Sequence, residues 1–197
     1  MDKPLRIGIF GGTFDPVHNV HLRIARAARD RVGLDRVLFV VAATPPHKRD
    51  EVVASAEDRL AMVRAATQGE EGFEASRIEM DRPGPSYTVD TVRALAEAHP
   101  GARLYLIIGY DAALDLPRWR DPRAILKRAR LIVVRRPECD SALDPSLDGM
   151  HEMLPFEASD LSSTEVRDLL AQGGDARELL PPAVLEHIRG KGLYGCR

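Results

Sequence analysis

The sequence predicts a doubly wound α/β domain on a mostly parallel sheet, with a small helical part at the C-terminal end. Short apolar runs rich in β-branched residues alternate with amphipathic segments, the pattern of a sheet covered by helices on both faces. Two glycines, Gly11 and Gly12, directly follow the first of these runs. A chain of 197 residues, 44% of them hydrophobic, is long enough to bury one sizeable core.

Six segments have the length and composition of strands. The first is apolar and stops at the two glycines, and the last is the weakest of the set. The predicted strands cover residues 6–10, 37–42, 74–80, 104–108, 131–134 and 152–156.

Six further segments have the spacing of amphipathic helices. Residues 55–58 and 162–165 both match helix-start capping patterns. The first helix has one apolar stripe and a glycine as its C-terminal stop: Leu22, Ala25, Ala28, Val32 and then Gly33. The predicted helices cover residues 20–32, 56–67, 88–98, 123–128, 163–172 and 182–191.

The pattern shows no internal repeat and no linker between domains. We therefore expect a single domain over residues 1–197, in which residues from about 160 onward form the helical C-terminal part.

Composition narrows the class of protein. The 28 basic and 30 acidic side chains give a net charge of −2, which argues against a nucleic-acid-binding protein. The apolar runs are of strand length, so no membrane span is expected, and no signal peptide is recognisable. Two cysteines, Cys139 and Cys196, do not make a disulfide framework. We expect a cytoplasmic protein. A homo-oligomer is compatible with the sequence, which does not determine the oligomeric state.

The segment from Gly11 to His21, GGTFDPVHNVH, is the strongest functional signal. Glycines at the end of a strand let the backbone approach a ligand closely, and a hydroxyl and two imidazoles follow them. No side chain here is a good nucleophile next to a base. The pattern favours a site that positions phosphates and stabilises charge without a covalent bond. A tight turn or two metal-binding histidines are the alternatives, although no third ligand stands at zinc spacing.

A second signal lies at residues 160–167, DLSSTEVR. Two hydroxyls stand where the fifth predicted helix begins, and Arg167 follows about one turn later. Helix N-termini bind anions, and arginine binds phosphate oxygens at two points. Ordinary helix capping is the alternative. Residues 45–48 and 109–111 also follow predicted strands, at the sheet edge where open α/β folds bind ligands.

Together these motifs resemble the Rossmann-like nucleotidyltransferase superfamily of adenylyl- and cytidylyltransferases. Residues 11–21 are similar to its H-x-x-H phosphate loop, and residues 162–167 to its S-S-T-x-x-R signature. Residues 45–48, 85–88, 107–111, Trp119 and 179–194 narrow the resemblance to the bacterial nicotinate-mononucleotide adenylyltransferases. The likeness runs almost from end to end. It implies transfer of AMP from ATP to nicotinate mononucleotide, giving deamido-NAD and pyrophosphate.

The resemblance also implies roles for individual residues. Catalysis would rest on cationic and imidazole side chains, namely His18, His21, Lys48 and Arg167. ATP would be held by Gly11, Gly12, Thr13, Phe14, His18, His21, Gly109, Asp111, Ser163, Thr164 and Arg167. The nicotinate mononucleotide would be held by His47, Lys48, Tyr87, Thr88, Trp119 and Arg135. Mg²⁺ would be carried mainly by the ATP phosphates, and no metal ligands are assigned to the protein.

Several of these positions have a structural alternative. Asp111 could cap a helix, Trp119 could anchor a loop to the core, and Arg135 with Arg136 could be a solvated pair. Val20 stands where the family usually has glycine. If that position requires a positive φ or space beyond Cα, valine strains the loop; if it is merely helical, a small rearrangement suffices. A transferase for another phosphate ester, or a nucleotide-binding regulator without catalysis, are the alternative functions.

Overall fold

The computed structural model describes residues 3–44, 52–135, 142–156 and 161–196. The predictions for His47, Lys48, Arg136 and Cys139 lie outside the described residues.

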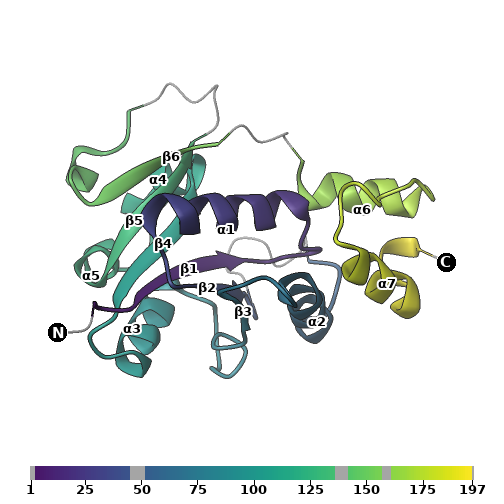
Figure 1. Cartoon of the computed structure of the whole chain (residues 1–197), viewed down its shortest axis with the longest axis horizontal. Helices are drawn as coiled ribbons and strands as arrows, with labels where there is room; N and C mark the ends of the chain where they lie inside the picture. The colour runs from purple at the N-terminus through teal and green to yellow at the C-terminus, as the bar shows by residue number, and fades with distance from the viewer. Residues whose placement is uncertain (1–2, 45–51, 136–141, 157–160, 197) are drawn as a thin grey trace.

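The centre of the molecule is a six-stranded sheet in the order β3-β2-β1-β4-β5-β6 (Figure 1). Every neighbouring pair is parallel. The chain reverses its winding direction between β1 and β4, so the carboxyl ends of these two strands border the crevice in which such folds bind ligands. The strands are β1 (Arg6–Gly12), β2 (Arg36–Val41), β3 (Phe73–Ser76), β4 (Arg103–Gly109), β5 (Ala129–Arg135) and β6 (His151–Pro155).

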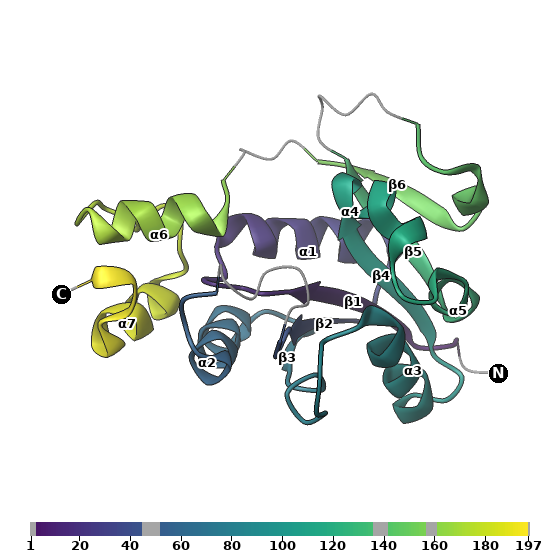
Figure 2. The same ribbon diagram turned by 180° about the vertical axis from the view of Figure 1, so that it is seen from behind.

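Helices cover both faces of this sheet, and two of them extend beyond the carboxyl end of β1 (Figure 2). The α-helices are α1 (Asn19–Val32), α2 (Ala56–Thr67), α3 (Thr88–Ala98), α4 (Tyr110–Asp115), α5 (Pro122–Arg128), α6 (Ser163–Ala171) and α7 (Pro182–Lys191). The 3-10 turns are η2 (Leu116–Arg118), η3 (Pro145–Leu147) and η4 (Leu193–Gly195).

Alternation along the strands divides the interior into two apolar clusters. In β1, Phe10 faces the cluster that also holds the buried faces of α1, α2, α6 and α7. Ile7 and Ile9 face the other cluster, with α3, α4 and α5. Because α6 and α7 share the first cluster with the sheet, the C-terminal helices pack as a continuation of the main core.

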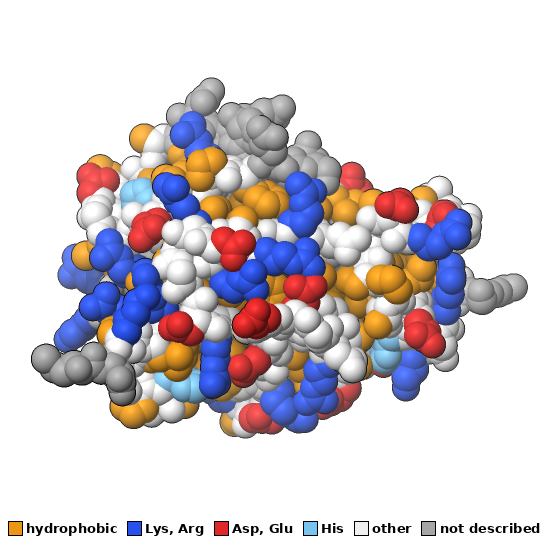
Figure 3. Space-filling view, in the orientation of Figure 1, with side chains coloured by type: hydrophobic (Ala, Val, Ile, Leu, Met, Phe, Trp, Pro, Cys, Tyr) orange, Lys and Arg blue, Asp and Glu red, His pale blue; other side chains and the backbone are white. Residues whose placement is uncertain are grey.

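The outer surface mixes both signs of charge. Figure 3 shows Lys and Arg side chains interspersed with Asp and Glu over the face that α1 covers. No helix in the described part of the chain is both long enough and apolar enough to cross a membrane.

The predicted elements are confirmed with two differences. The third strand was expected to reach residue 80 but ends at Ser76, because the chain turns there: the amides of Met80 and Asp81 both donate to the carbonyl of Arg77. Helix α4 was not predicted. It begins directly after β4, with Gly109 as its N-cap, and it is only six residues long, so it has too few turns to show a helical period.

Candidate functional site

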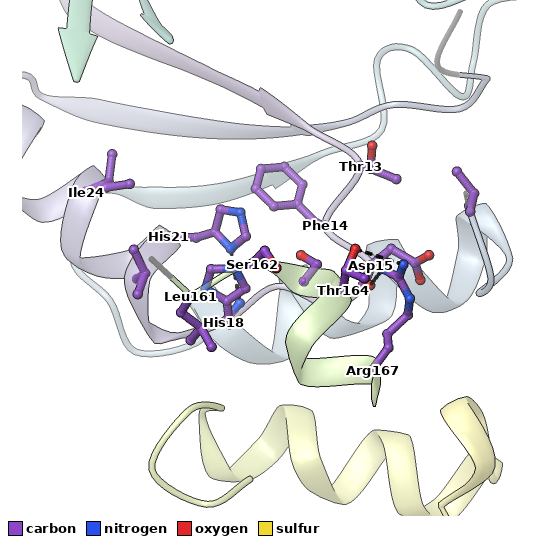
Figure 4. Close-up of a pocket in the computed structure, with 13 residues that line it drawn as sticks. Thr13, Phe14, Asp15, His18, His21, Ile24, Leu161, Ser162, Thr164 and Arg167 are labelled. Carbon is purple, nitrogen blue, oxygen red and sulfur yellow. Dashed lines mark hydrogen bonds between the residues drawn. The ribbon is translucent and has the colours of Figure 1, made fainter. Parts of the chain in front are cut away.

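The two sequence motifs meet at one cavity of about 290 Å³. Residues of the β1–α1 loop form one part of its wall and the start of α6 forms another, although 150 residues of sequence separate them (Figure 4). The cavity is lined by Thr13, Phe14, Asp15, His18, Val20, His21, Ile24, Val52, Leu161, Ser162, Ser163, Thr164 and Arg167. The structure therefore brings together Thr13, His18, His21, Ser163, Thr164 and Arg167, as predicted.

The β1–α1 loop takes its shape from a buried phenylalanine. Phe14 is 2% exposed and has a φ of 51°, a left-handed conformation that side chains rarely adopt. Its ring packs edge-on against Phe10, with centroids 5.7 Å apart. A Cβ on Gly12 would lie 2.9 Å from that ring, so this position requires glycine. Around Gly11 nothing lies within 4 Å of an added Cβ, and this glycine faces open space. The Phe14 side chain thus belongs to the core.

His18 and His21 lie against each other at the start of α1. Their ring centroids are 3.8 Å apart, and the backbone N–H of His18 donates to Nδ1 of His21 over 3.2 Å. A neutral ring that accepts at Nδ1 carries its proton at Nε2, so His21 is an N–H donor at that atom. The His18 side chain is buried, and its Nδ1 has no hydrogen-bond partner. One ring atom is thus left without a protein partner.

Both imidazoles are neutral at physiological pH. Burial lowers the pKa of His18 from 6.5 to about 4, and the carboxylate of Glu165 opposes this in part. Burial, and then the neighbouring His18 ring, lower the pKa of His21 well below 6.5. The two histidines are therefore neutral side chains in the folded protein, and neither needs a counter-ion.

The lowered pKa of His18 predicts a loss of stability in mild acid. The unfolded chain takes up this proton near pH 6.5 and the folded chain only near pH 4, so stability is present above pH 6.5 and is lost as pH falls. By about pH 5 the loss from this residue is about 2 kcal/mol. We expect the urea midpoint of the wild type to fall between about pH 7.5 and pH 5 more than that of His18→Gln. Equal falls would contradict this account.

Helix α6 presents its first turn and an arginine to the loop. Ser162 caps the helix by accepting from the amide of Glu165, as its motif predicted. The Ser163 hydroxyl donates to the carbonyl of Pro16 over 2.9 Å. Arg167 donates to the carbonyl of Asp15 over 2.8 Å and to the Thr164 hydroxyl over 3.2 Å. The capping alternative is confirmed for Ser162, whose hydroxyl caps the helix. Ser163, Thr164 and Arg167 line the cavity, so the cap leaves room for an anion site, which stays a prediction.

Val20 does not strain the loop. It is the second residue of α1, and the non-glycine residues of positive φ in the described ranges are Phe14, Asp121 and Tyr194. Its side chain is 7% exposed and lines the cavity, so valine takes part of the space near the histidines. Of the two alternatives for this position, the helical one is confirmed.

A second, smaller cavity of about 120 Å³ is lined by residues from the carboxyl-terminal parts of β1 and β4 and from the end of β2. Gly11 and Gly12 form part of its wall, together with Ser86, Thr88 and Trp119. The Ser86 hydroxyl accepts from the amides of Ala43 and Thr44 over 3.1 and 3.3 Å, which ties the segment before α3 to the end of β2. Trp119 is half-buried against the second core cluster and also lines this cavity. Anchoring a loop and contacting a ligand are thus compatible for this tryptophan.

The remaining predicted residues are more dispersed. Gly109 and Asp111 are exposed at the end of β4, and the cap of α4 is Gly109, so the expectation that Asp111 could cap the helix is wrong. Tyr87 is the N-cap of α3, and the guanidinium of Arg120 lies over its ring at 4.7 Å. Arg135 ends β5 with its guanidinium 6.0 Å from the Tyr110 ring, outside the lining of both cavities.

Sequence reasoning missed the buried polar groups behind the site. Asp15 lies inside the segment from Gly11 to His21, but the motif predicts no role for its side chain. The sequence places Arg59 in a predicted helix and Tyr194 in the C-terminal segment, without a function for either. Glu79, 8% exposed, lines the second cavity and accepts from the Thr91 hydroxyl over 2.5 Å. A charged residue in an amphipathic segment reads as solvent-facing, so no local signal marks these side chains as buried.

Metal ligands do not gather at either cavity. Across the ranges that the structure describes, no group of three or more His, Cys, Asp or Glu side chains is arranged to hold a metal ion. The polar groups that line the larger cavity include imidazoles, hydroxyls and one guanidinium.

Known proteins resemble this chain over nearly its whole length. The model of the cytidylyltransferase-like family matches residues 9–169. A protein of Gloeobacter violaceus, named "Probable nicotinate-nucleotide adenylyltransferase", is 46% identical over 96% of each chain. A Roseiflexus protein of the same name is 46% identical over 95% of this chain and 97% of its own. Among solved structures, the Plasmodium falciparum nicotinic acid mononucleotide adenylyltransferase complexed with NaAD has a TM-score of 0.78 at 18% identity, covering 98% of both chains. That structural likeness shows a shared fold.

Proposed function

Because the chain belongs to the cytidylyltransferase-like family and, within it, to the nicotinate-nucleotide adenylyltransferases, we propose that it transfers AMP from ATP to nicotinate mononucleotide. The products are deamido-NAD and pyrophosphate, and the reaction belongs to NAD biosynthesis. A cytoplasmic location and the absence of nucleic-acid binding stay predictions from the sequence.

The observation that carries this proposal is a pair of cavities lined by successive residues where β1 ends: Gly11 and Gly12 line the smaller one, and Thr13 lines the larger one. One offers imidazoles, hydroxyls and Arg167, which suit a triphosphate. The other offers an indole ring and the segment from Ser86 to Thr88, which suit a planar ring with a polar substituent. Two sites lined by successive residues of one loop would hold two nucleotides with their phosphates next to each other.

The chemistry asks for positioning and for charge stabilisation. An oxygen of the mononucleotide's 5′-phosphate attacks the α-phosphorus of ATP, a new P–O bond forms, and the bond to the β-phosphate oxygen breaks. The electron pair of that bond leaves with pyrophosphate. The attacking oxygen is already anionic, so no general base is needed. The barrier lies in bringing two polyanions together, and fixed donors directed at the developing charge lower it.

On the ATP side, His18, His21 and Arg167 donate to phosphate oxygens in this proposal, with the hydroxyls of Thr13 and Thr164. The Ser163 hydroxyl joins them when it turns from the Pro16 carbonyl, to which its single proton is donated in this structure. Phosphate charge next to the imidazoles favours their protonated forms, which strengthens these contacts as ATP binds. The open backbone at Gly11 and Gly109 admits the nucleotide, and Asp111 accepts from a ribose hydroxyl. Lys48 and His47, outside the described residues, are assigned to the phosphates at the reacting centre.

On the other side, Trp119 stacks on the nicotinate ring, and the backbone near Tyr87 and Thr88 receives the ring carboxylate. A pyridinium ring is electron-poor, and aromatic faces attract cations. Arg135 is assigned to the substrate phosphate from the end of β5. Mg²⁺, if bound with ATP, would neutralise part of the phosphate charge, and no residue of the protein is assigned to hold it.

The proposal is tested by pyrophosphate release with Mg–ATP and each of two acceptors, nicotinate mononucleotide and its nicotinamide analogue. We expect the acid to be used at least about tenfold more efficiently, because a backbone donor left facing an uncharged amide loses a charge-assisted contact. A competitive assay with both acceptors in one tube gives this ratio directly.

Two results would contradict the proposal at different levels. Equal use of both acceptors would remove the preference for the acid and leave adenylyl transfer in place. Tight ATP binding in a calorimeter, without pyrophosphate release for either acceptor, would exclude the proposed substrate. A screen of other phosphate esters then separates a transferase for another ester, which releases pyrophosphate with one of them, from a nucleotide-binding regulator, which releases none.

A further inference from the structure

A buried carboxylate stands directly behind the phosphate loop. Asp15 is 2% exposed, and its two oxygens accept three hydrogen bonds. The amide of Val53 donates to Oδ2 over 2.7 Å, and the amide of Ala54 donates to Oδ1 over 3.1 Å. The third donor is the hydroxyl of Tyr194, at 2.6 Å from Oδ1. Asp15 thus joins the β1–α1 loop to the start of α2 and to the last turn of the chain.

A buried arginine, Arg59, also binds the β1–α1 loop. Arg59 of α2 is 1% exposed and donates to the carbonyl of Thr13 over 2.8 Å and to that of Ala42 over 2.7 Å. Its Nε donates to the carbonyl of Ala54 over 3.3 Å. Burial lowers the pKa of Arg59, and the nearby charge of Asp15 opposes that shift. The guanidinium therefore connects the ends of β1 and β2 next to the carboxylate.

The other side of the loop faces α6. Arg167 donates to the carbonyl of Asp15, and Ser163 donates to the carbonyl of Pro16. The carboxylate of the same Asp15 accepts the three hydrogen bonds from Val53, Ala54 and Tyr194. The loop is thus fixed between the residues assigned to the ATP phosphates and the Asp15 network. The Asp15 carboxylate and the carbonyl to which Arg167 is bonded belong to one residue, so the hydrogen bonds that hold the carboxylate also restrain the position of that carbonyl.

The backbone of Tyr194 has a conformation that is uncommon for a residue other than glycine. Its φ is 56°, a left-handed conformation that favours glycine, and the side chain is 8% exposed. It lines neither cavity. The conformation directs the phenol inward to Asp15, and desolvation together with the Asp15 hydrogen bond raises its pKa. The hydroxyl therefore stays protonated and keeps its role as donor.

We propose that Tyr194 is a positioning residue for ATP: through Asp15, its hydroxyl sets the place of the phosphate loop and of Arg167. The C-terminal turn η4 thereby becomes part of the ATP site without touching the nucleotide. This inference deepens the proposed function and rests on it. A purely structural anchor would instead affect only the fraction of folded protein.

The test is Tyr194→Phe, with Tyr105→Phe as the matched control. Tyr105 is 3% exposed, and its hydroxyl accepts from Arg6 over 2.9 Å in a part-buried hydrogen bond, so each variant keeps its buried ring and loses a phenol hydrogen bond to a charged partner. We expect Tyr194→Phe to raise the Kd for ATP and to lower kcat, together by about tenfold or more, because small displacements of a positioning group are costly. The KM for nicotinate mononucleotide stays within about twofold, since the second cavity is held by other contacts. Tyr105→Phe leaves all of these values within about twofold.

A second variant tests whether the effect passes through Asp15. In the Asp15→Asn background, which has already lost the carboxylate, Tyr194→Phe is expected to add little, because coupled residues are not additive. If Asp15→Asn does not fold, the comparison of the two tyrosine variants still decides.

Equal values for Tyr194→Phe and Tyr105→Phe in ATP affinity and kcat would overturn the inference. So would a rise in both KM values in proportion. The Kd for ATP is measured without turnover, so it decides the inference even if the wild type releases no pyrophosphate, a result that would count against the proposed function alone.

Discussion

Replacing Arg167 with alanine is expected to lower kcat/KM for ATP by about 10²- to 10³-fold, among the largest effects of any single change in this protein. Arg167 is the cation at the larger cavity among the described residues, and it reaches both the Asp15 carbonyl and the Thr164 hydroxyl. In the proposed reaction, its loss removes positive charge from the place where pyrophosphate develops its negative charge. It also removes a hydrogen bond between α6 and the β1–α1 loop and leaves the one from Ser163 to Pro16.

Two further variants make this result specific. Arg167→Lys keeps the charge but lacks the planar fork, so we expect an intermediate loss. Arg177→Ala removes an exposed arginine of the same C-terminal part, one that pairs with Asp175, and should leave the rate unchanged. Initial rates at varied ATP check all three. A value for Arg167→Ala within twofold of the wild type would exclude Arg167 from the phosphate site.

Replacing His18 with alanine is expected to lower kcat by about 10²-fold or more while the protein stays folded. The His18 ring is buried at the cavity wall and lies against the His21 ring, tilted from it by 39°, and its Nδ1 has no hydrogen-bond partner in the protein. A donor fixed in advance costs no reorganisation during the reaction, and alanine replaces it with a void. Because the proposed contact strengthens as charge builds up, kcat falls more than ATP affinity.

The control for this variant is another partly buried histidine outside both cavities. In α7, Nε2 of His187 lies 3.4 Å from Oδ1 of Asp58. We expect His187→Ala to have the kcat of the wild type. His18→Gln retains an N–H donor and should recover part of the rate. Single-turnover measurements separate the chemical step from product release. An unchanged single-turnover rate in His18→Ala would refute the role of this imidazole on the transferring phosphate.

Much of the fold could be predicted because its signals are local. The apolar stripe of α1, the stop at Gly33 and the cap at Ser162 are each set by residues within a few positions. Two segments, β3 and α4, differ from the prediction for separate reasons. β3 is an edge strand paired only with β2, so it ends where that pairing ends. Helix α4 is too short to show a period in the sequence.

The amino-acid sequence alone was enough to predict the candidate site: glycines, imidazoles and hydroxyls placed where strands end and helices begin, a pattern that parallel α/β folds bring to one edge. How these groups are arranged and which charge they carry depends on the folded chain. The strand order places β1 next to β4, and the packing of α6 on the β1–α1 loop closes the larger cavity. Burial sets the charge state of His18 and turns Asp15, Arg59 and Tyr194 into one network. The physical reason is that desolvation and hydrogen bonding depend on neighbours distant in sequence, which no local pattern can report.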